Sequence, residues 1–504
     1  MNIGKLTLCE RSGWRHFCAA FLFCAAAAIG STAQTLTTMV QFDETNGQEP
    51  NGLIQGFDGN FYGTTLSGGT RSGFGVGTIF ILSRAGSLST LYNFCTTSCN
   101  DGDDPEAGVI QANDGNFYGT TSGGGTSGAC NGGCGTIYRL TPKGKETTLH
   151  SFASLDGSFS QAGLIQAVDG TFYGTTASGG AKCNGFVPCY GTVFKITPGG
   201  KLTTLHSFCL KIGCTDGLNP SAGLVQATNG NFYGTTPSGG NANSGGTIFQ
   251  ITPSGKFATI YSFCSQTNCA DGSSPGGPML AADGNLYGTT GAGGTNGKGT
   301  VFQITPTGIL TTLYSFCSQT NCPDGSAPVG LIQATDGNFY GTTTSGGANC
   351  APTGCGTIFS LTPTGTLTTL YSFCAETNCT DGIEPTVAFM QATDGNFYGT
   401  TLAGGLDICF EEFSCGTVFR LSTALGPFVK LTQDSGKVGQ IGGILGQGFT
   451  GTTGVFLNGT PASFTVVSDT FIEATVPSGA TSGFVTVNTP SGTLTSNVPF
   501  RVTP

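Results

Sequence analysis

Gly-Asn-Phe-Tyr-Gly-Thr-Thr, residues 59–65, is the first copy of a stretch that recurs through most of the chain. Unchanged or with one substitution, it returns around six later tyrosines, at steps of 53 to 60 residues: Tyr118, Tyr173, Tyr233, Tyr287, Tyr340 and Tyr398. A period of this length is typical of repeat architectures. A unit so small cannot bury a core alone, so we expect neighbouring repeats to pack on one another.

The sixth copy shows which strands to expect within one repeat. Residues 330–334 and 339–343 read as two strands joined by the hairpin turn Asp336-Gly337-Asn338. After a glycine-rich loop, residues 356–361 and 367–373 read as a third and a fourth strand. Four strands in a meander, followed by a longer connection to the next unit, are the pattern of a propeller blade.

Seven such repeats predict an all-β, seven-bladed β-propeller over residues 34–423. The chain enters this region through a lone strand at 36–42, and the last repeat stops after its third strand at 416–421. We therefore expect the N-terminal strand to complete the last blade, which removes the open strand edges. A parallel β-solenoid is the alternative, although it needs no such complement between its ends.

The two ends of the chain differ from the repeats. Residues 427–504 carry short alternating runs bounded by Gly, Pro and Ser, which suits a small Ig-like β-sandwich. In residues 1–33, Lys5, Arg11 and Arg15 precede an apolar run that ends at Ser31-Thr32-Ala33. This is the pattern of a secretory signal peptide. We expect a secreted or bacterial cell-surface protein with no transmembrane anchor after signal cleavage.

Composition narrows the possible partners. The net charge is −10 and only 9% of the residues are charged. A protein that binds phosphates needs clustered Lys and Arg, so we expect no nucleic-acid partner. We expect a monomer without a cofactor.

The repeat resembles the GloVer-type tandem repeat of exported bacterial proteins, through the phrase Gly-Leu-Ile-Gln-Ala-x-Asp-Gly-Asn-Phe-Tyr-Gly-Thr-Thr at residues 330–343. The tail is similar to an IPT/TIG immunoglobulin-like domain at residues 442–449, 455–462 and 485–487. The resemblance implies a surface or secreted protein and supplies no chemistry.

Cysteines outside residues 1–33 fall into close pairs. A repeat that lacks one member of a pair lacks both, as at residues 152–157, which predicts local disulfides in an exported chain. Zinc binding is the alternative, but no His accompanies the pairs. The nine predicted disulfide pairs are Cys95/Cys99, Cys130/Cys134, Cys183/Cys189, Cys209/Cys214, Cys264/Cys269, Cys317/Cys322, Cys350/Cys355, Cys374/Cys379 and Cys409/Cys415.

Acidic residues that recur at one repeat position are expected to shape loops. Asp58 and its equivalents occupy the hairpin turn, and a second set opens an Asp-Gly-x-x-Pro-like segment in each long connection. Weak calcium ligands are the alternative for the second set, at Asp101, Asp216, Asp271, Asp324 and Asp381. His150 and His206 fill a strand position that is Tyr in other repeats, so we expect a structural role for both.

Carboxylates that do not recur are better catalytic candidates, because a ring with one active site must break its own symmetry. Such residues form two clusters, Asp103, Asp104 and Glu106 in one and Asp407, Glu411 and Glu412 in the other. A glycosidase needs two carboxyl groups about 5 to 10 Å apart. In an up-down meander both clusters lie on the face that carries the long loops.

The leading hypothesis is a non-catalytic binding or scaffold protein that presents disulfide-tied loops on one propeller face to glycan, matrix or protein partners. The alternative is an extracellular carbohydrate-active enzyme, a hydrolase or a lyase, that uses the unrepeated acidic loops.

Overall fold

The computed structural model describes residues 34–70, 76–96, 98–181, 190–210, 212–385, 389–405 and 415–503. Within these ranges the protein is all-β, and its helical segments are the short 3-10 turns η1 (Cys99–Asp101), η2 (Thr267–Cys269) and η3 (Thr377–Cys379). No helix in the same ranges is long and apolar enough to cross a membrane. The predicted signal peptide lies outside the described residues.

Each repeat folds into an antiparallel sheet whose strands follow in meander order, and these sheets number seven among the described residues. The first three sheets comprise β2 (Gln48–Gln55), β3 (Phe61–Ser67), β4 (Thr78–Leu82) and β5 (Leu88–Asn93); β6 (Ile110–Gln111), β7 (Phe117–Thr121), β8 (Thr136–Leu140) and β9 (Glu146–Ser151); and β10 (Ile165–Gln166), β11 (Phe172–Thr176), β12 (Thr192–Ile196) and β13 (Leu202–Ser207).

The remaining repeats follow the same order, with an additional short strand, β18, in the fifth. Their strands are β14 (Val225–Gln226), β15 (Phe232–Thr236), β16 (Thr247–Ile251) and β17 (Phe257–Ser262); β18 (Ser273–Pro275), β19 (Met279–Leu280), β20 (Leu286–Ala292), β21 (Thr300–Ile304) and β22 (Leu310–Ser315); β23 (Ser326–Gln333), β24 (Phe339–Ser345), β25 (Thr357–Leu361) and β26 (Leu367–Ser372); and β27 (Met390–Gln391), β28 (Phe397–Thr401) and β29 (Thr417–Ser422).

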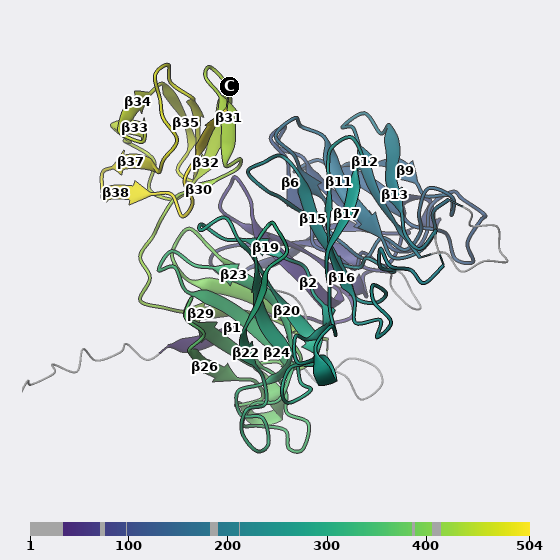
Figure 1. The fold of residues 1–504 in the computed structure, drawn as a ribbon. Helices are drawn as coiled ribbons and strands as arrows, with labels where there is room; N and C mark the ends of the chain where they lie inside the picture. Colours follow the sequence, from purple (N-terminus) through teal and green to yellow (C-terminus); the bar gives the residue numbers. More distant parts are fainter. Residues whose placement is uncertain are drawn as a thin grey trace, which may run out of the picture. The chain divides into compact units, whose positions relative to one another are not determined.

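The first strand of the chain belongs to the last repeat. β1 (Thr35–Gln41) pairs antiparallel with β29, with Leu36 opposite Leu421, and Figure 1 shows the purple β1 beside the green β29. The backbone amide of Phe42 extends this pairing by donating to the carbonyl of Gly416. The pairing predicted between the two ends of the repeat region is confirmed, whereas an open solenoid has no such contact.

The aromatic residues of the recurring stretch stack the repeats. Tyr62 packs on Phe117 of the next repeat with ring centroids 4.3 Å apart, and Phe61 packs on Tyr398 of the last repeat at 4.2 Å. Because both faces of β3 are covered by neighbouring sheets, both rings are buried between repeats. Although side chains alternate between the two faces of a strand, both rings therefore belong to the core.

The small and polar residues of the stretch also have defined roles. Gly63 lies opposite Phe80, and a Cβ atom on Gly63 would come within 2.5 Å of the Phe80 ring. The hydroxyl of Thr64 donates to the carbonyl of Ala107 in the next repeat at 3.0 Å. Gly63 therefore makes room for the neighbouring ring, and Thr64 links one sheet to the next.

A glutamine near the start of six of the seven repeat sheets adds a further link. The side-chain oxygen of Gln111 accepts a hydrogen bond from the backbone amide of Phe57 in the preceding repeat, at 2.8 Å. Gln55 accepts in the same way from Thr393 at 3.0 Å, which joins the first repeat to the last. The fifth repeat has Leu280 at this position and lacks the bond.

The C-terminal region forms two four-stranded sheets and a short parallel pair. The two sheets share one buried core, which contains Val429, Ile444, Val455, Ile472 and Val487. The strands are β30 (Lys430–Leu431), β31 (Ser435–Lys437), β32 (Ile441–Leu445), β33 (Gly454–Leu457), β34 (Thr460–Ala462), β35 (Phe464–Ser468), β36 (Phe471–Thr475), β37 (Val485–Thr489), β38 (Gly492–Thr495) and β39 (Arg501–Thr503).

Candidate functional site

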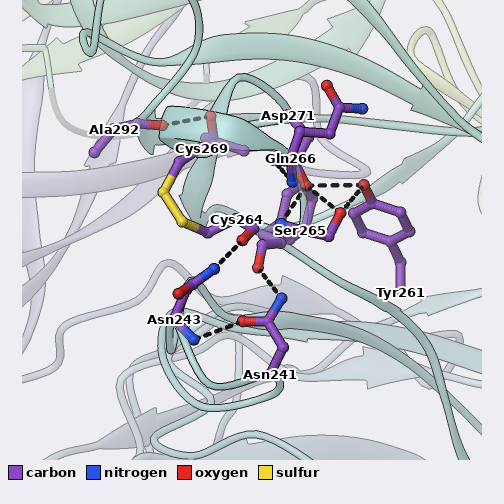
Figure 2. Close-up of a disulfide and its surroundings, with 11 residues drawn as sticks. Asn241, Asn243, Tyr261, Cys264, Ser265, Gln266, Cys269, Asp271 and Ala292 are labelled. Atoms are coloured by element: carbon purple, nitrogen blue, oxygen red, sulfur yellow. Dashed lines mark hydrogen bonds between the residues drawn. A yellow bond between two sulfur atoms is a disulfide. The ribbon is translucent and has the colours of Figure 1, made fainter.

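The recurring aspartates of the long connections are used by the chain itself. Asp271 is fully buried and accepts hydrogen bonds from the Tyr261 hydroxyl at 2.8 Å and from the backbone amides of Ser265 at 2.9 Å and Gln266 at 3.2 Å. Figure 2 shows these bonds beside the Cys264–Cys269 disulfide. Such bonds support the loop-shaping interpretation. The calcium interpretation stays a prediction, which a calcium-dependent thermal shift would test.

His150 and His206 replace the tyrosine in this arrangement. His150 lies opposite Ile137 in the strand pairing, as Tyr92 lies opposite Ile79. Its ring Nε2 is 2.9 Å from Asp156, and His206 Nε2 is 3.0 Å from Asp216. Burial raises the pKa of Asp156, but the hydrogen bonds from His150 and the Ala153 amide outweigh it, so the pKa lies below its ordinary value. The structural role predicted for both histidines fits these contacts.

Disulfides tie the loops of several repeats. Within the described residues, the bonded pairs are Cys95–Cys99, Cys130–Cys134, Cys209–Cys214, Cys264–Cys269, Cys317–Cys322, Cys350–Cys355 and Cys374–Cys379. These bonds follow the pairs predicted from the sequence. Cys183, Cys189 and Cys409 lie outside the described residues.

The first predicted acidic cluster is divided by the fold. The backbone of Asp103 exchanges two hydrogen bonds with Gly123, and its carboxylate lies within 4.8 Å of the sulfur atoms of Cys95 and Cys99. Asp104 and Glu106 instead interact with each other through their charges. The second cluster, Asp407, Glu411 and Glu412, lies outside the described residues.

Glu49, which the sequence analysis did not single out, is the equivalent of Asp104 in the first repeat. Glu49 and Asp104 occupy the same repeat position, directly before a proline, and both have a left-handed backbone, with φ of 56° and 52°. Each backbone amide donates to the preceding repeat, from Glu49 to Cys415 and from Asp104 to Val76, both at 3.1 Å. Aligning the seven repeats at the residue before the proline would have revealed the match.

The same position carries a third carboxylate in the last repeat. Glu384 has φ of 54°, and its amide donates to Cys355 at 2.9 Å. The last repeat packs on the first, so Glu384, Glu49 and Asp104 come from three consecutive repeats. The four other repeats have neutral polar or apolar residues here, Phe159, Asn219, Ser274 and Ala327. The carboxylates are therefore gathered on one part of the repeat array.

Two of these carboxyl groups hold their protons more tightly than usual. Partial burial raises the pKa of Glu49, and the negative charge of Asp104 raises it further. Partial burial also raises the pKa of Asp104, and Glu106 adds to this effect. A pair of carboxyl groups in such a setting can divide the roles of proton donor and proton acceptor.

Glu146, at the start of β9, is a separate carboxyl group of this kind. Burial raises its pKa, as does the charge of Asp101, while a hydrogen bond from the Thr148 hydroxyl at 3.0 Å opposes the rise. It lines an open polar hollow with Asp101, Thr148 and His150. Neither Glu49 nor Asp104 lines this hollow, so Glu146 serves as a comparison for the pair above.

The fold and the linked repeats define an all-β tandem-repeat protein. The Gloeobacter/Verrucomicrobia repeat matches residues 28–209, 131–323 and 317–459. The chain belongs to this repeat family. No curated protein matches the chain.

Solved structures resemble this chain at low sequence identity. A fungal alcohol oxidase of the AA5 family, in complex with copper, is 12% identical, and the match covers 94% of this chain and 100% of that chain with a TM-score of 0.52. The PQQ-bound aldose sugar dehydrogenase from Streptomyces coelicolor is 10% identical, with coverage of 77% and 98% and a TM-score of 0.37.

These comparisons contradict the expectation of a non-catalytic binding or scaffold protein, because the fold is shared with an enzyme along nearly the whole chain. The expectation rests on a family resemblance that supplies no chemistry. Such a resemblance excludes no activity, because neighbouring repeats can each contribute one residue to a site.

Proposed function

We propose that the chain is an extracellular carbohydrate-active enzyme, a hydrolase or a lyase, in which Glu49 and Asp104 carry the proton transfers. The observation that carries this proposal is the raised pKa of both carboxyl groups at equivalent positions of adjacent repeats. Cleavage of a glycosidic bond uses such a carboxyl pair, with one group donating a proton and the other accepting a proton or attacking the sugar.

We assign the two roles from the charge coupling between the groups. The negative charge of Asp104 raises the pKa of Glu49 and so favours its protonated form. Glu49 then acts as the general acid towards the leaving-group oxygen, and Asp104 acts as the base or the nucleophile. Glu106 tunes Asp104 through its charge. The two residues share a left-handed backbone directly before Pro50 and Pro105.

The proposed architecture is a seven-bladed β-propeller over residues 34–423, closed by β1, followed by an IPT/TIG-like β-sandwich over residues 427–504. Support comes from the meander sheets, the β1–β29 pairing and the two-sheet core of the tail. Export after cleavage of residues 1–33 is supported by the local disulfides, since these persist in oxidising compartments.

A copper centre like that of the matched oxidase is not part of the proposal. Copper(II) favours imidazole ligands, and His150 and His206 lie in different repeats, each bonded to an aspartate. The carboxyl pair supports acid–base chemistry instead.

Turnover of a panel of neutral and acidic polysaccharides tests the proposal. Release of reducing ends reports hydrolysis, and ultraviolet absorbance of an unsaturated product reports lyase cleavage. The variants Glu49→Gln and Asp104→Asn are expected to lower kcat/KM by about 10² to 10⁴-fold, because each removes a proton-transfer group.

Glu146→Gln is the matched control, since it removes a carboxyl group with a raised pKa at another place. It is expected to leave turnover unchanged. Equal activity in Glu49→Gln, Asp104→Asn and the native protein would contradict the assignment of the site. Absence of turnover by the native protein across the panel would contradict the proposed enzyme class.

A further inference from the structure

Two disulfides of the sixth repeat lie against each other. Cys350–Cys355 closes the loop between β24 and β25, and Cys374–Cys379 lies in the connection after β26. All four sulfur atoms lie within 4.8 Å of one another. The side-chain amide of Asn349 joins the two loops by donating to the carbonyls of Ser372 at 3.0 Å and Phe373 at 2.9 Å.

The spacing of these sulfur atoms suits a tetrahedral thiolate site. Zinc bound by four cysteines has Zn–S distances of about 2.3 Å, which places the sulfur atoms roughly 3.8 Å apart. Cys355 is 7% exposed and the other three cysteines are partly buried, so the loops shield the sulfur atoms without sealing them off. We propose that Cys350, Cys355, Cys374 and Cys379 bind one Zn²⁺ ion when both disulfides are reduced.

The proposed site exists only in the reduced protein. A phosphine reductant converts each disulfide into two thiols and is itself oxidised to the phosphine oxide, with its oxygen taken from water. Zinc then displaces the four thiol protons, because thiolates are the ligands of the metal. Binding is therefore expected to release protons and to strengthen as the pH rises. A disulfide oxidant such as oxidised glutathione accepts the four electrons, restores the two disulfides and so releases the metal.

Among the described residues, no second pair lies beside Cys264–Cys269 or Cys317–Cys322. At Cys264–Cys269 the neighbouring loop offers Asn243, whose side-chain amide donates to the Cys264 carbonyl at 2.7 Å (Figure 2). At Cys317–Cys322 the neighbouring loop offers Asn296, which donates to Phe316 at 3.0 Å. The third repeat carries both kinds of pair in its sequence, but Cys183 and Cys189 lie outside the described residues.

Metal titration of the phosphine-reduced full chain tests the site. Cd²⁺ gives a thiolate-to-metal absorbance band, and competition with a chromogenic chelator gives the zinc stoichiometry. Cys374→Ser is expected to lose one equivalent of tight Zn²⁺ relative to the native chain. Cys317→Ser, which alters an isolated pair, is expected to lose none. Equal stoichiometry in all three proteins would overturn the proposal.

A second variant avoids reduction of the whole molecule, which risks unfolding. Cys350→Ser combined with Cys374→Ser, purified without reductant and under argon, leaves two thiols while the other disulfides remain. It is expected to bind one equivalent of Cd²⁺ through Cys355 and Cys379, with the thiolate band. Cys317→Ser under the same conditions leaves one thiol and is expected to bind at least tenfold more weakly. Absence of the band in the double variant would overturn the proposal.

Discussion

The residue directly before the proline of a repeat has a constant backbone role and a variable side chain. At the residue before the proline, Glu49, Asp104 and Ala327 share a left-handed φ and a backbone hydrogen bond to the preceding repeat. Because the backbone alone makes this link, the side chain is free to vary. The left-handed φ is therefore a common feature of the repeats and does not mark the proposed site. Only the carboxylate side chains distinguish that site.

Glu106→Gln is predicted to move the pH dependence of the proposed activity. The charge of Glu106 raises the pKa of Asp104, so its removal lowers that pKa. Asp104 acts when ionised, and activity rises as the pH rises through its pKa. The acidic limb of kcat/KM is therefore expected to shift to lower pH, while the plateau falls by less than about tenfold because Glu106 transfers no proton itself. An unshifted limb would contradict the coupling.

Asp271→Asn is predicted to destabilise the fold at neutral pH by about 1 to 3 kcal/mol, because it removes a buried charged acceptor. Burial raises the pKa of Asp271, but bonds from Ser265 and Tyr261 outweigh this and hold the pKa below 3.8. Its stabilising effect is therefore complete above pH 4 or so and is lost as the pH falls through the folded-state pKa. Denaturant unfolding at pH 7 and pH 3, with exposed Glu473→Gln as control, measures the difference. The same loss at both pH values would contradict the linkage.

At the scale of strands, the sequence predicted most of one repeat. The expected strands 339–343, 356–361 and 367–373 correspond to β24, β25 and β26 with shifts of one or two residues at their ends. The first strand is less regular, since β23 has eight residues while β6 has two. Its pairing depends on the register shift between Val329 and Leu331, which no local pattern encodes.

Gly341→Ala is predicted to destabilise the repeat region by about 1 to 3 kcal/mol through overpacking. A Cβ atom there would lie 2.6 Å from the Phe359 ring and 2.9 Å from the carbonyl of Gly330. Gly199→Ala is the control, because its Cβ would meet only the Thr197 hydroxyl, at 3.9 Å. Phe359→Leu in the Gly341→Ala background is expected to recover part of the loss. Denaturant unfolding measures all four proteins, and equal stability of the two glycine variants would contradict the packing argument.

At the scale of the whole molecule, the sequence predicted the closing pair of strands but not the site. Residues 36–42 and 416–421 were recognisable because each lacked a partner in its own repeat. Glu49 was not recognisable, since it is 55 residues from Asp104 and becomes its neighbour only when one repeat stacks on the next. Of the proposed pair, only Asp104 was therefore predicted from the sequence.

Removal of residues 34–41 is predicted to destabilise the repeat region and to promote self-association. The deletion leaves β29 as an unpaired edge, which pairs readily with other chains. Static light scattering and thermal unfolding measure the two effects. A synthetic peptide of residues 34–42 is expected to restore the native melting temperature by strand addition, whereas a scrambled peptide is not. A deletion variant that melts like the native chain would contradict the role of β1.

The pairing of β1 with β29 also delays the last step of folding until β29 has been synthesised. The ribosome makes Thr35 early and Ser422 last among the paired residues, and at about 5 to 20 residues per second the wait between them is roughly 20 to 80 s. During that interval β1 has no strand to pair with. We therefore expect a chaperone that covers these first residues during synthesis to raise the yield of molecules in which β1 pairs with β29.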